Sequence, residues 1–330
     1  MSMREEAIPA VLIEAFSSRA FGGNGAAVVR LQVPRSAPWM QGVAASLRQS
    51  ETAFLLERPE GWLLRWFTPR CEVPLCGHAT LAALLALAHW RTLEPGQTVQ
   101  FHSRSGALEA SLPCDQPGWG SIVLPSSGLT PTSPPLGLSS LLREQLGSDC
   151  LAFWSSELGY QVALLPEEAP LGAMEAPGDR LEGDLRRGLV LMQSISPAAA
   201  GPQISGARAD YQLRFFAPGL GIPEDPVTGS AHALVAPWWQ QRFGRPIVRG
   251  WQCSDRPGGM LCEATSSGMI RLTGSGHLLW DGTLRTASGG CAAERPEGSP
   301  PGVSEQAADW SEWQTATHWP YSIPSGAIPS

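Results

Sequence analysis

The sequence contains no lysine, so arginine and histidine supply all of its basic side chains. A Schiff base to pyridoxal phosphate needs a lysine amine, and the phosphate-binding loop of many nucleotide enzymes needs a lysine as well. Both kinds of site are excluded. An enzyme made from this chain would have to activate a carbon acid without the usual anchor of pyridoxal phosphate.

Other common features are also missing. The seven cysteines include no C-x-x-C pair, which argues against a zinc cage or a complete disulfide framework and favours a reducing compartment. The first ten residues lack an apolar signal segment, and the longest apolar run, residues 81–88, is too short to cross a bilayer. The net charge of -7 argues against a nucleic-acid groove. We therefore expect a cytoplasmic protein with no nucleic-acid or membrane partner.

With 330 residues, of which 43% are hydrophobic and 16% charged, the chain is long enough for two globular domains. Proline and serine gather at residues 125–135, which we interpret as a linker. We predict an N-terminal domain over residues 8–128 and a C-terminal domain over residues 129–286, whose last strands can return to the first domain. Residues 287–330 have the composition of a disordered tail.

One motif occurs twice. In the first copy, LRWFTP at residues 64–69 leads to EVPLCGHA at residues 72–79. In the second copy, LRFFAP at residues 213–218 leads to EDPVTGSA at residues 224–231. An ordered set of this length is hard to obtain by chance, so we infer an internal duplication into two similar halves.

Matching positions in the two copies carry different side chains. His78 is matched by Ser230, and Asp225 is matched by Val73. Two half-sites that differ in this way predict one composite site between the halves.

Each copy opens an apolar helix with a glycine, Gly77 or Gly229. The predicted central helices cover residues 80–90 and 231–239. The free backbone N–H groups and the dipole at a helix start attract anions. A hydroxyl such as that of Thr228 is expected to accept a hydrogen bond from one of those N–H groups. We expect the two helix starts to face each other across an interdomain cleft.

Glu51 is the first candidate for acid–base chemistry. It follows a predicted helix at residues 36–48, capped by Ser36, and begins an apolar strand. The negative end of the helix dipole and partial burial are both expected to raise its pKa, as suits a proton shuttle. The alternative is a solvated glutamate in a loop.

Asn24 and His78 also have structural alternatives. Asn24 lies in a glycine cluster at residues 21–25, which is either a tight turn or a loop that faces a substrate. His78 lies in the first turn of a predicted helix, where it could simply bond a backbone group.

These motifs together resemble the phenazine biosynthesis-like (PhzF-like) isomerase family. The matching stretches are residues 15–28, 50–54, 65–80 and 216–232, in family order within residues 11 to 285, with Gly25 where the family often has proline. The resemblance implies the α/β (α+β) fold of diaminopimelate epimerase. That fold has two pseudo-symmetric domains, each a barrel-like and mostly antiparallel sheet around a central helix.

The resemblance also implies a function: a cofactor-independent isomerase that moves a proton between carbons of a small anionic metabolite. The catalytic positions match Glu51, His78 and Asp225, and the substrate-binding positions match Asn24, Gly77, Gly229 and Ser230. We expect a small carboxylate substrate, no cofactor and a homodimer. We also expect no metal between Glu51 and His78, because no further ligand lies at suitable spacing in the sequence.

Two alternative functions stay open. Relatives with the same fold are two-thiol racemases, with a cysteine directly before the glycine of each helix; here those positions hold Cys76 and Thr228. A threonine hydroxyl is too weak an acid to share protons with a thiolate, so Cys76 is better explained as a small buried residue than as a base. The second alternative is a non-catalytic ligand-binding relative.

Overall fold

The computed structural model describes residues 5–196, 200–265 and 268–287. They form two compact units. Among the described residues, the first unit contains residues 5–13, 25–117 and 278–287, and the second contains residues 14–24 and those between 118 and 277. The predicted disordered tail lies, apart from Ala287, outside the described residues.

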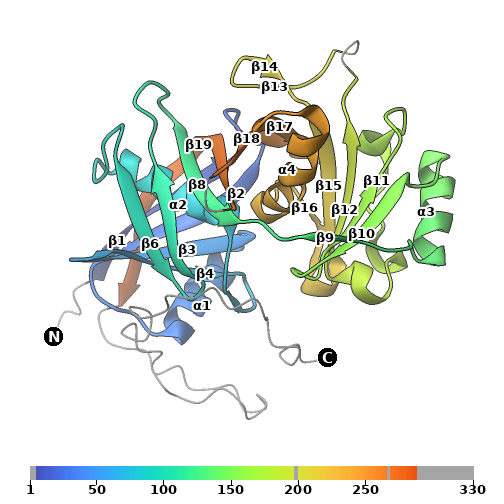
Figure 1. Ribbon diagram of the computed structural model, residues 1–330. Helices are drawn as coiled ribbons and strands as arrows, with labels where there is room; N and C mark the ends of the chain where they lie inside the picture. Colours follow the sequence, from blue (N-terminus) through green and yellow to red (C-terminus); the bar gives the residue numbers. More distant parts are fainter. Residues whose placement is uncertain (1–4, 197–199, 266–267, 288–330) are drawn as a thin grey trace, which may run out of the picture. The chain divides into compact units, whose positions relative to one another are not determined.

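The first unit is a curved sheet with a helix against it (Figure 1). Its elements are β1 (Glu5–Ala15), β2 (Asn24–Leu31), α1 (Ala37–Leu47), β3 (Glu51–Arg58), β4 (Gly61–Phe67), β5 (Glu72–Val73), α2 (Gly77–His89), β6 (Thr98–Ser103) and β7 (Gly106–Ser111). Strand β3 is antiparallel to β4 and parallel to β2, β4 pairs with β5 antiparallel and β6 parallel, and β6 is antiparallel to β7. The predicted capping of α1 by Ser36 is confirmed, because its side chain accepts from the Trp39 N–H.

Helix α2 is the predicted central helix of the first half. Its residues from Gly77 to Leu87 are all buried, and it contacts β3 and β7. A helix that is apolar on every side must be enclosed by other elements, which explains its place against the sheet.

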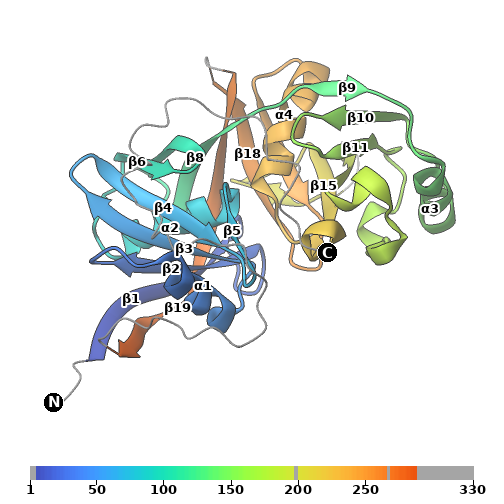
Figure 2. The ribbon, with the colours of Figure 1, turned by 90° about the horizontal axis from the view of Figure 1, so that it is seen from below.

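The second unit has the same kind of architecture, seen from two sides in Figures 1 and 2. Its elements are β8 (Trp119–Pro125), β9 (Leu129–Pro131), α3 (Leu136–Leu146), β10 (Ala152–Ser156), β11 (Gln161–Leu164), three 3-10 turns (Leu171–Ala173, Gly178–Arg180 and Gly183–Arg186), β12 (Leu189–Ser194), β13 (Gln203–Ile204), β14 (Ala207–Arg208), β15 (Tyr211–Ala217), a further 3-10 turn (Pro218–Leu220), β16 (Ile222–Asp225), α4 (Gly229–Phe243), β17 (Ile247–Gln252), β18 (Gly258–Ala264) and β19 (Met269–Ala287). Helix α4 contacts β8, β17 and β18.

The order and pairing of elements repeat between the units. Strands β3, β4 and β5, helix α2 and strands β6 and β7 correspond to β12, β15 and β16, α4, and β17 and β18. In both sets the second strand is antiparallel to the first and the third and parallel to the strand after the helix. The internal duplication predicted from the repeated motif is therefore confirmed in the topology.

A buried arginine joins the strand of each repeat to the segment before its helix. Arg65 of β4 donates from Nε and Nη2 to the two carboxylate oxygens of Glu72, at 2.8 Å each. Its side chain is 1% exposed, and its guanidinium lies 5.3 Å from the centre of the Phe67 ring. A bidentate pair of this kind fixes orientation as well as position.

The second repeat contains the same pair. Arg214 of β15 donates from Nε and Nη2 to Glu224 at 2.7 and 2.6 Å, with its guanidinium 5.0 Å from the Phe216 ring. Its Nη1 also donates to the carbonyls of Leu171 and Met174. The arginine and glutamate of the repeated motif are thus structural residues in both copies.

The division of the chain differs from the predicted boundary between residues 128 and 129. The second unit begins at Gly118, because β8 pairs with β19 along its whole length, from Trp119 opposite Ser275 to Pro125 opposite Met269. The predicted linker contains a strand, β9, which pairs with β10.

Two segments at the ends of the predicted domains belong to the unit that they contact. Residues 14–24 belong to the second unit, where the Phe16 carbonyl accepts from the Gly259 N–H and the Gly23 N–H donates to Pro257. Residues 278–287 at the end of β19 belong to the first unit.

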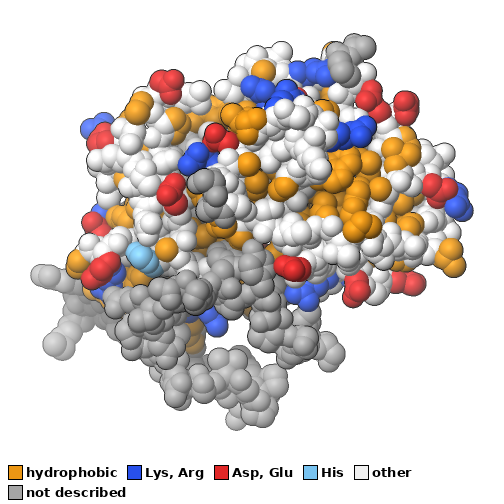
Figure 3. All heavy atoms as spheres, viewed as in Figure 1, with side chains coloured by type: hydrophobic (Ala, Val, Ile, Leu, Met, Phe, Trp, Pro, Cys, Tyr) orange, Lys and Arg blue, Asp and Glu red, His pale blue; other side chains and the backbone are white. Residues whose placement is uncertain are grey.

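Charged side chains of both signs lie on the surface shown in Figure 3. On the face shown in Figure 3, acidic and basic side chains of the described residues are interspersed and form no continuous basic area. None of the helices in the described part of the chain is both long enough and apolar enough to cross a membrane.

Removing the buried arginine is expected to unfold the protein more readily. Arg65→Ala removes the buried, bidentate partner of Glu72 and leaves it only the more exposed Arg104 at 3.4 Å, which should lower the free energy of unfolding by about 3 kcal/mol. Arg143→Ala is the matched control, since the Arg143–Asp149 pair is exposed (63% and 51%) and its loss should cost less than about 1 kcal/mol. Urea denaturation followed by circular dichroism measures both. Equal effects of the two substitutions would contradict a structural role for Arg65.

Candidate active site

Glu51 and His78 form a buried ion pair in the first unit. Glu51 is the first residue of β3, and His78 lies in the first turn of α2. Nε2 of His78 lies 3.0 Å from Oε2 of Glu51, and their side chains are 6% and 10% exposed. Both residues were predicted to belong to the site, and the fold brings them into contact. The solvated alternative for Glu51 is wrong.

Ser50 and Cys76 complete the cluster around the imidazole. The Ser50 hydroxyl donates to the Gly25 carbonyl at 3.1 Å, and its oxygen lies 3.1 Å from Nε2 of His78. The sulfur of Cys76 lies 3.4 Å from Nδ1 of His78. Ser50 directly precedes Glu51 in the sequence, but it was not predicted to be a site residue.

Cys76 is buried, as predicted, but it is not remote from the acid–base pair. One ligand atom each of Glu51, Cys76 and His78 lies within 4.8 Å of the others. The expectation that no further ligand lies beside Glu51 and His78 is therefore wrong. Cys76 is the residue directly before α2, so its side chain lies beside the first turn that carries His78.

The pKa of Glu51 is lowered from its ordinary value of 4.5, against the predicted direction. Burial would raise it, but the charge of His78 and the hydrogen bonds from His78, Ser50 and Cys76 together outweigh burial. Burial likewise disfavours the charged form of His78, yet Cys76 and Glu51 raise the pKa of His78 well above 6.5. Burial raises the pKa of the Cys76 thiol to about 11, so near neutral pH the thiol is uncharged and the Glu51 carboxylate keeps His78 protonated.

Asp225 is the centre of a second cluster, in the second unit. The Asn24 amide donates to its Oδ1 at 2.7 Å and to the Val227 carbonyl at 3.2 Å. The Thr228 hydroxyl donates to its Oδ2 at 2.5 Å. Both carboxylate oxygens thus accept a hydrogen bond from a buried side chain, and the structure brings together the predicted site residues Asn24 and Asp225.

The predicted cap of α4 is wrong. Thr228 is the residue before the helix, but its side chain makes no capping hydrogen bond, because the hydroxyl is used by Asp225. The side chain of Cys76 also makes no capping hydrogen bond at the start of α2. At both helix starts the first backbone N–H groups are therefore not capped by the residue that precedes the helix.

Gln252 is a further member of this cluster that sequence reasoning missed. It is fully buried at the end of β17. Its amide nitrogen donates to the Asp225 carbonyl at 2.5 Å, and its amide oxygen accepts from the Thr228 N–H at 2.8 Å. Gln252 therefore holds the backbone on both sides of the turn that leads into α4. Its only signal in the sequence is a polar residue at the end of an alternating strand.

Ser230, a predicted substrate-binding residue, has a different partner. Its hydroxyl oxygen lies 3.3 Å from the Tyr160 hydroxyl. The Tyr160 ring packs edge-on against Phe215, with 4.9 Å between the ring centres. The hydroxyls of Ser230 and Tyr160 thus lie together beside the start of α4.

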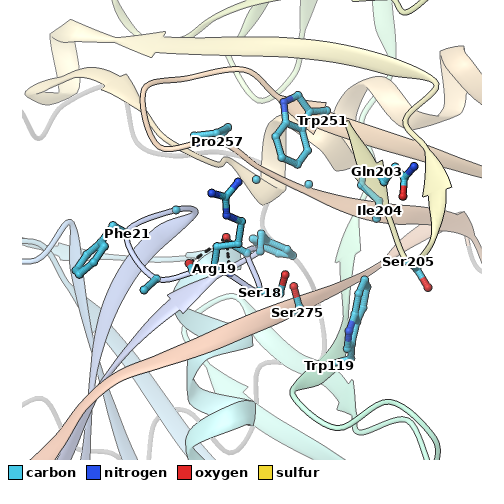
Figure 4. A pocket seen from close by; sticks show the side chains of 16 residues that line it. Ser18, Arg19, Phe21, Trp119, Gln203, Ile204, Ser205, Trp251, Pro257 and Ser275 are labelled. Carbon is cyan, nitrogen blue, oxygen red and sulfur yellow. Dashed lines mark hydrogen bonds between the residues drawn. The ribbon is translucent and has the colours of Figure 1, made fainter. Parts of the chain in front are cut away.

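A cavity of about 390 Å³ in the second unit lies apart from these contacts. It is lined by residues 16–22 and 257–259 together with residues such as Trp119, Trp251 and Ser275. Figure 4 shows Arg19 extending toward Trp251 and Pro257 within this cavity. None of the described residues that line it is a predicted site residue, so the cavity is not the candidate active site.

Comparison with known proteins shows which family the chain matches. Residues 13–147 and 169–282 match the PhzC-PhzF family, described as phenazine biosynthesis-like protein. An uncharacterized isomerase of Pseudomonas aeruginosa is 36% identical over 273 residues, which cover 83% of this chain and 97% of that protein. The crystal structure of a PhzF-family phenazine biosynthesis protein from Enterococcus faecalis matches with a TM-score of 0.73 and 27% identity, over 84% of this chain and 99% of that one.

The likeness of fold extends further. A probable proline racemase from Agrobacterium radiobacter K84 matches with a TM-score of 0.57 at 11% identity, over 86% of this chain and 93% of that one. At this identity only the fold is shared. The epimerase-type α/β fold that the family resemblance implied is confirmed.

The charge state of His78 can be tested by NMR titration of the imidazole protons. His78 is expected to stay protonated at about pH 7, above the ordinary range for histidine. His232 is an internal control, because burial lowers its pKa to about 3 and it should stay neutral. Glu51→Gln removes one of the two groups that raise the pKa of His78, so burial should then bring that pKa down. An ordinary pKa for His78 in the unmodified protein would contradict the ion pair.

The same pair gives stability a definite pH dependence. Its contribution is fully present between about pH 4.5 and 6.5, where the two groups are charged in both the unfolded and the folded chain. The contribution is lost as the pH falls through the lowered pKa of Glu51, and again as the pH rises through the raised pKa of His78.

Proposed function

The chain is an isomerase that belongs to the PhzC-PhzF family of phenazine biosynthesis-like proteins, and we propose that it moves a proton between two carbons of a small anionic metabolite without a cofactor. The observation that carries this proposal is the buried ion pair of Glu51 and His78. It supplies an ionised carboxylate and a fixed proton donor in one place. The chain contains no lysine, so no lysine amine can do this acid–base work.

Glu51 is the proposed base. Its carboxylate takes a proton from a carbon that a neighbouring carbonyl or diene makes acidic. A positioned general base of this kind typically contributes about 10²- to 10⁴-fold to the rate. Because the carboxylate is already ionised, it can accept the proton without first losing one. The same carboxylate, or a relay partner, then returns the proton to another carbon, which completes the isomerisation.

The helix starts at Gly77 and Gly229 are proposed to stabilise the anion that forms. Their first-turn N–H groups are not capped by the preceding side chain, and each carries the positive end of a helix dipole. A well-aimed donor to a developing anion contributes about 3 kcal/mol. His78 and Asp225 are proposed to hold the substrate and relay protons, with Asn24 and Ser230 as binding residues.

We propose that both clusters act on one substrate. The duplication supports this, because two equivalent helix starts carry different and complementary side chains. Chain connectivity supports it as well. Asn24 donates to Asp225, and Gly25, the next residue, accepts from Ser50 beside His78.

A racemase or epimerase that uses Cys76 is the second candidate. It is favoured by the contact of the Cys76 sulfur with His78, at 3.4 Å from Nδ1. It is disfavoured by burial, which raises the pKa of the thiol to about 11 and leaves little thiolate. The equivalent position in the second repeat is Thr228, whose hydroxyl is held by Asp225.

Hydrogen exchange at carbon tests the proposed base. The protein is incubated in deuterated water with small cyclic and diene carboxylates, and exchange is followed by NMR. Glu51→Gln should lower the exchange rate by about 10²- to 10⁴-fold. Glu57→Gln is the matched control on the same strand, since the Glu57 side chain is 61% exposed, and it should keep the rate. Asp225→Asn should lower the rate too, because Asp225 is proposed to hold the same substrate.

Each outcome of the exchange experiment has a meaning. Wild-type exchange in Glu51→Gln would remove Glu51 as the base. Unchanged exchange in Asp225→Asn would remove the shared substrate. A ligand that binds but never exchanges at carbon would favour a non-catalytic ligand-binding protein.

Cysteine chemistry separates the two catalytic candidates. Under the proposed mechanism, Cys76→Ala removes a contact to His78 but neither the base nor the ion pair, and it should keep exchange within about tenfold of the wild type. Iodoacetamide should react with the exposed Cys71 and Cys114 without inactivation that the substrate prevents. Abolished exchange in Cys76→Ala, together with substrate-protected inactivation, would establish the racemase instead.

A further inference from the structure

The cluster in the first unit has the composition of a metal site. Glu51, Cys76 and His78 offer a carboxylate, a sulfur and an imidazole, with one ligand atom of each within 4.8 Å of the others. No other group of three such residues occurs in the described part of the chain. All three residues are buried, with 7%, 7% and 4% of their surface exposed.

The distances in the cluster suit a tetrahedral ion. Zinc binds sulfur at about 2.3 Å and nitrogen or oxygen at about 2.0–2.1 Å, so the ligand atoms of a tetrahedral centre lie about 3.3–3.6 Å apart. Here Oε2 of Glu51 lies 3.0 Å from Nε2 of His78, and that nitrogen lies 3.8 Å from the sulfur of Cys76. Small side-chain rotations would bring both distances to the ideal range.

The ligand set also decides which ion would bind. A thiolate and an imidazole favour zinc and similar ions, whereas magnesium and calcium take oxygen ligands. The charges balance as well. The Glu51 carboxylate and a Cys76 thiolate would neutralise a divalent ion, just as the carboxylate now neutralises His78. Three protein ligands leave one position of a tetrahedron for water or substrate.

We propose that Glu51, Cys76 and His78 form a binding site for a thiophilic divalent cation such as zinc, and that the bound ion inhibits the enzyme. The inhibition, unlike the binding, rests on the proposed function, since it follows from Glu51 being the base. A carboxylate oxygen that binds zinc cannot accept a proton from substrate.

Binding exchanges two protons for one ion. The Cys76 thiol loses its proton to become a thiolate ligand, and the proton shared by Glu51 and His78 also leaves, so that the imidazole nitrogen can bind the metal. Affinity should therefore rise with pH, by up to about a hundredfold per pH unit while both protons are released. Inhibition by zinc is accordingly strongest on the alkaline side.

Cobalt(II) provides a direct test on the full chain, because a thiolate bound to cobalt gives a charge-transfer absorption. One cobalt ion per chain should give this band in the wild type, and zinc should displace it. Cys76→Ala should abolish the band, whereas Cys114→Ala, which removes an exposed free thiol, should keep it. No band in the wild type, or an equal band in Cys76→Ala, would overturn the site. Circular dichroism of each variant checks that it is folded.

The inhibition is measured separately, as the ratio of carbon exchange with and without zinc in each protein. Zinc should suppress the wild type at least tenfold more strongly than Cys76→Ala. Equal suppression of both, or none of either, would overturn inhibition through this site. If neither protein exchanges at all, the proposed isomerisation fails, and the cobalt result alone still decides whether the cation site exists.

Discussion

The buried arginine–glutamate pair of each repeat determines where the functional helix begins. Arg65 and Arg214 each clamp a glutamate with two hydrogen bonds, and in each repeat the helix starts at the glycine that follows that glutamate at the same spacing. The loop between strand and glutamate is three residues longer in the second repeat. Three extra residues in a loop cost little free energy. A change in the number of residues between the glutamate and the helix would instead move every first-turn N–H group. The segment from the glutamate to the glycine, which has the same length in both repeats, is therefore the segment that positions the helix start.

The same scaffold carries two different kinds of buried carboxylate. In equivalent registers, Trp66 lies opposite Val73 and Phe215 lies opposite Asp225, so the second repeat has a carboxylate where the first has an apolar side chain. A buried charge is costly unless it is paired or hydrogen-bonded. Asp225 accepts from Asn24 and Thr228, whereas the carboxylate of the first unit, Glu51, comes from a different strand and pairs with a cation. Each unit thus satisfies its carboxylate in its own way, so two repeats with the same topology carry different polar clusters.

Much of the fold follows from patterns that are local in the sequence. The apolar run of α2, the serine cap of α1 and the repeated motif all predict elements that the structure contains. Helix α3 was missed, although Gly147 ends it in a left-handed conformation, and β9 was taken for linker because its pairing with β10 is not local. In the site, Glu51, His78, Asn24 and Asp225 were found from the motifs. The lowered pKa of Glu51, the use of the Thr228 hydroxyl and the role of Gln252 depend on contacts between distant segments, which no single stretch of sequence reveals.

The lowered pKa of Glu51 looks unfavourable for a base, because a weaker base has less driving force to remove a proton. The charge of the whole cluster resolves this difficulty. Before proton transfer, the protonated His78 is neutralised by the Glu51 carboxylate. In the proposed reaction the negative charge moves from Glu51 to the substrate, and Glu51 becomes neutral. A buried imidazolium left alone would be strongly disfavoured, but one that hydrogen-bonds the new substrate anion keeps a partner. His78 then changes its anionic partner and is never left unpaired. The relevant pKa of Glu51 is therefore its value beside a substrate anion, and because that anion competes for His78, it raises the pKa of Glu51. A neutral His78 could not provide this exchange, and for that reason the protonated imidazole is as important to the proposed chemistry as the carboxylate itself.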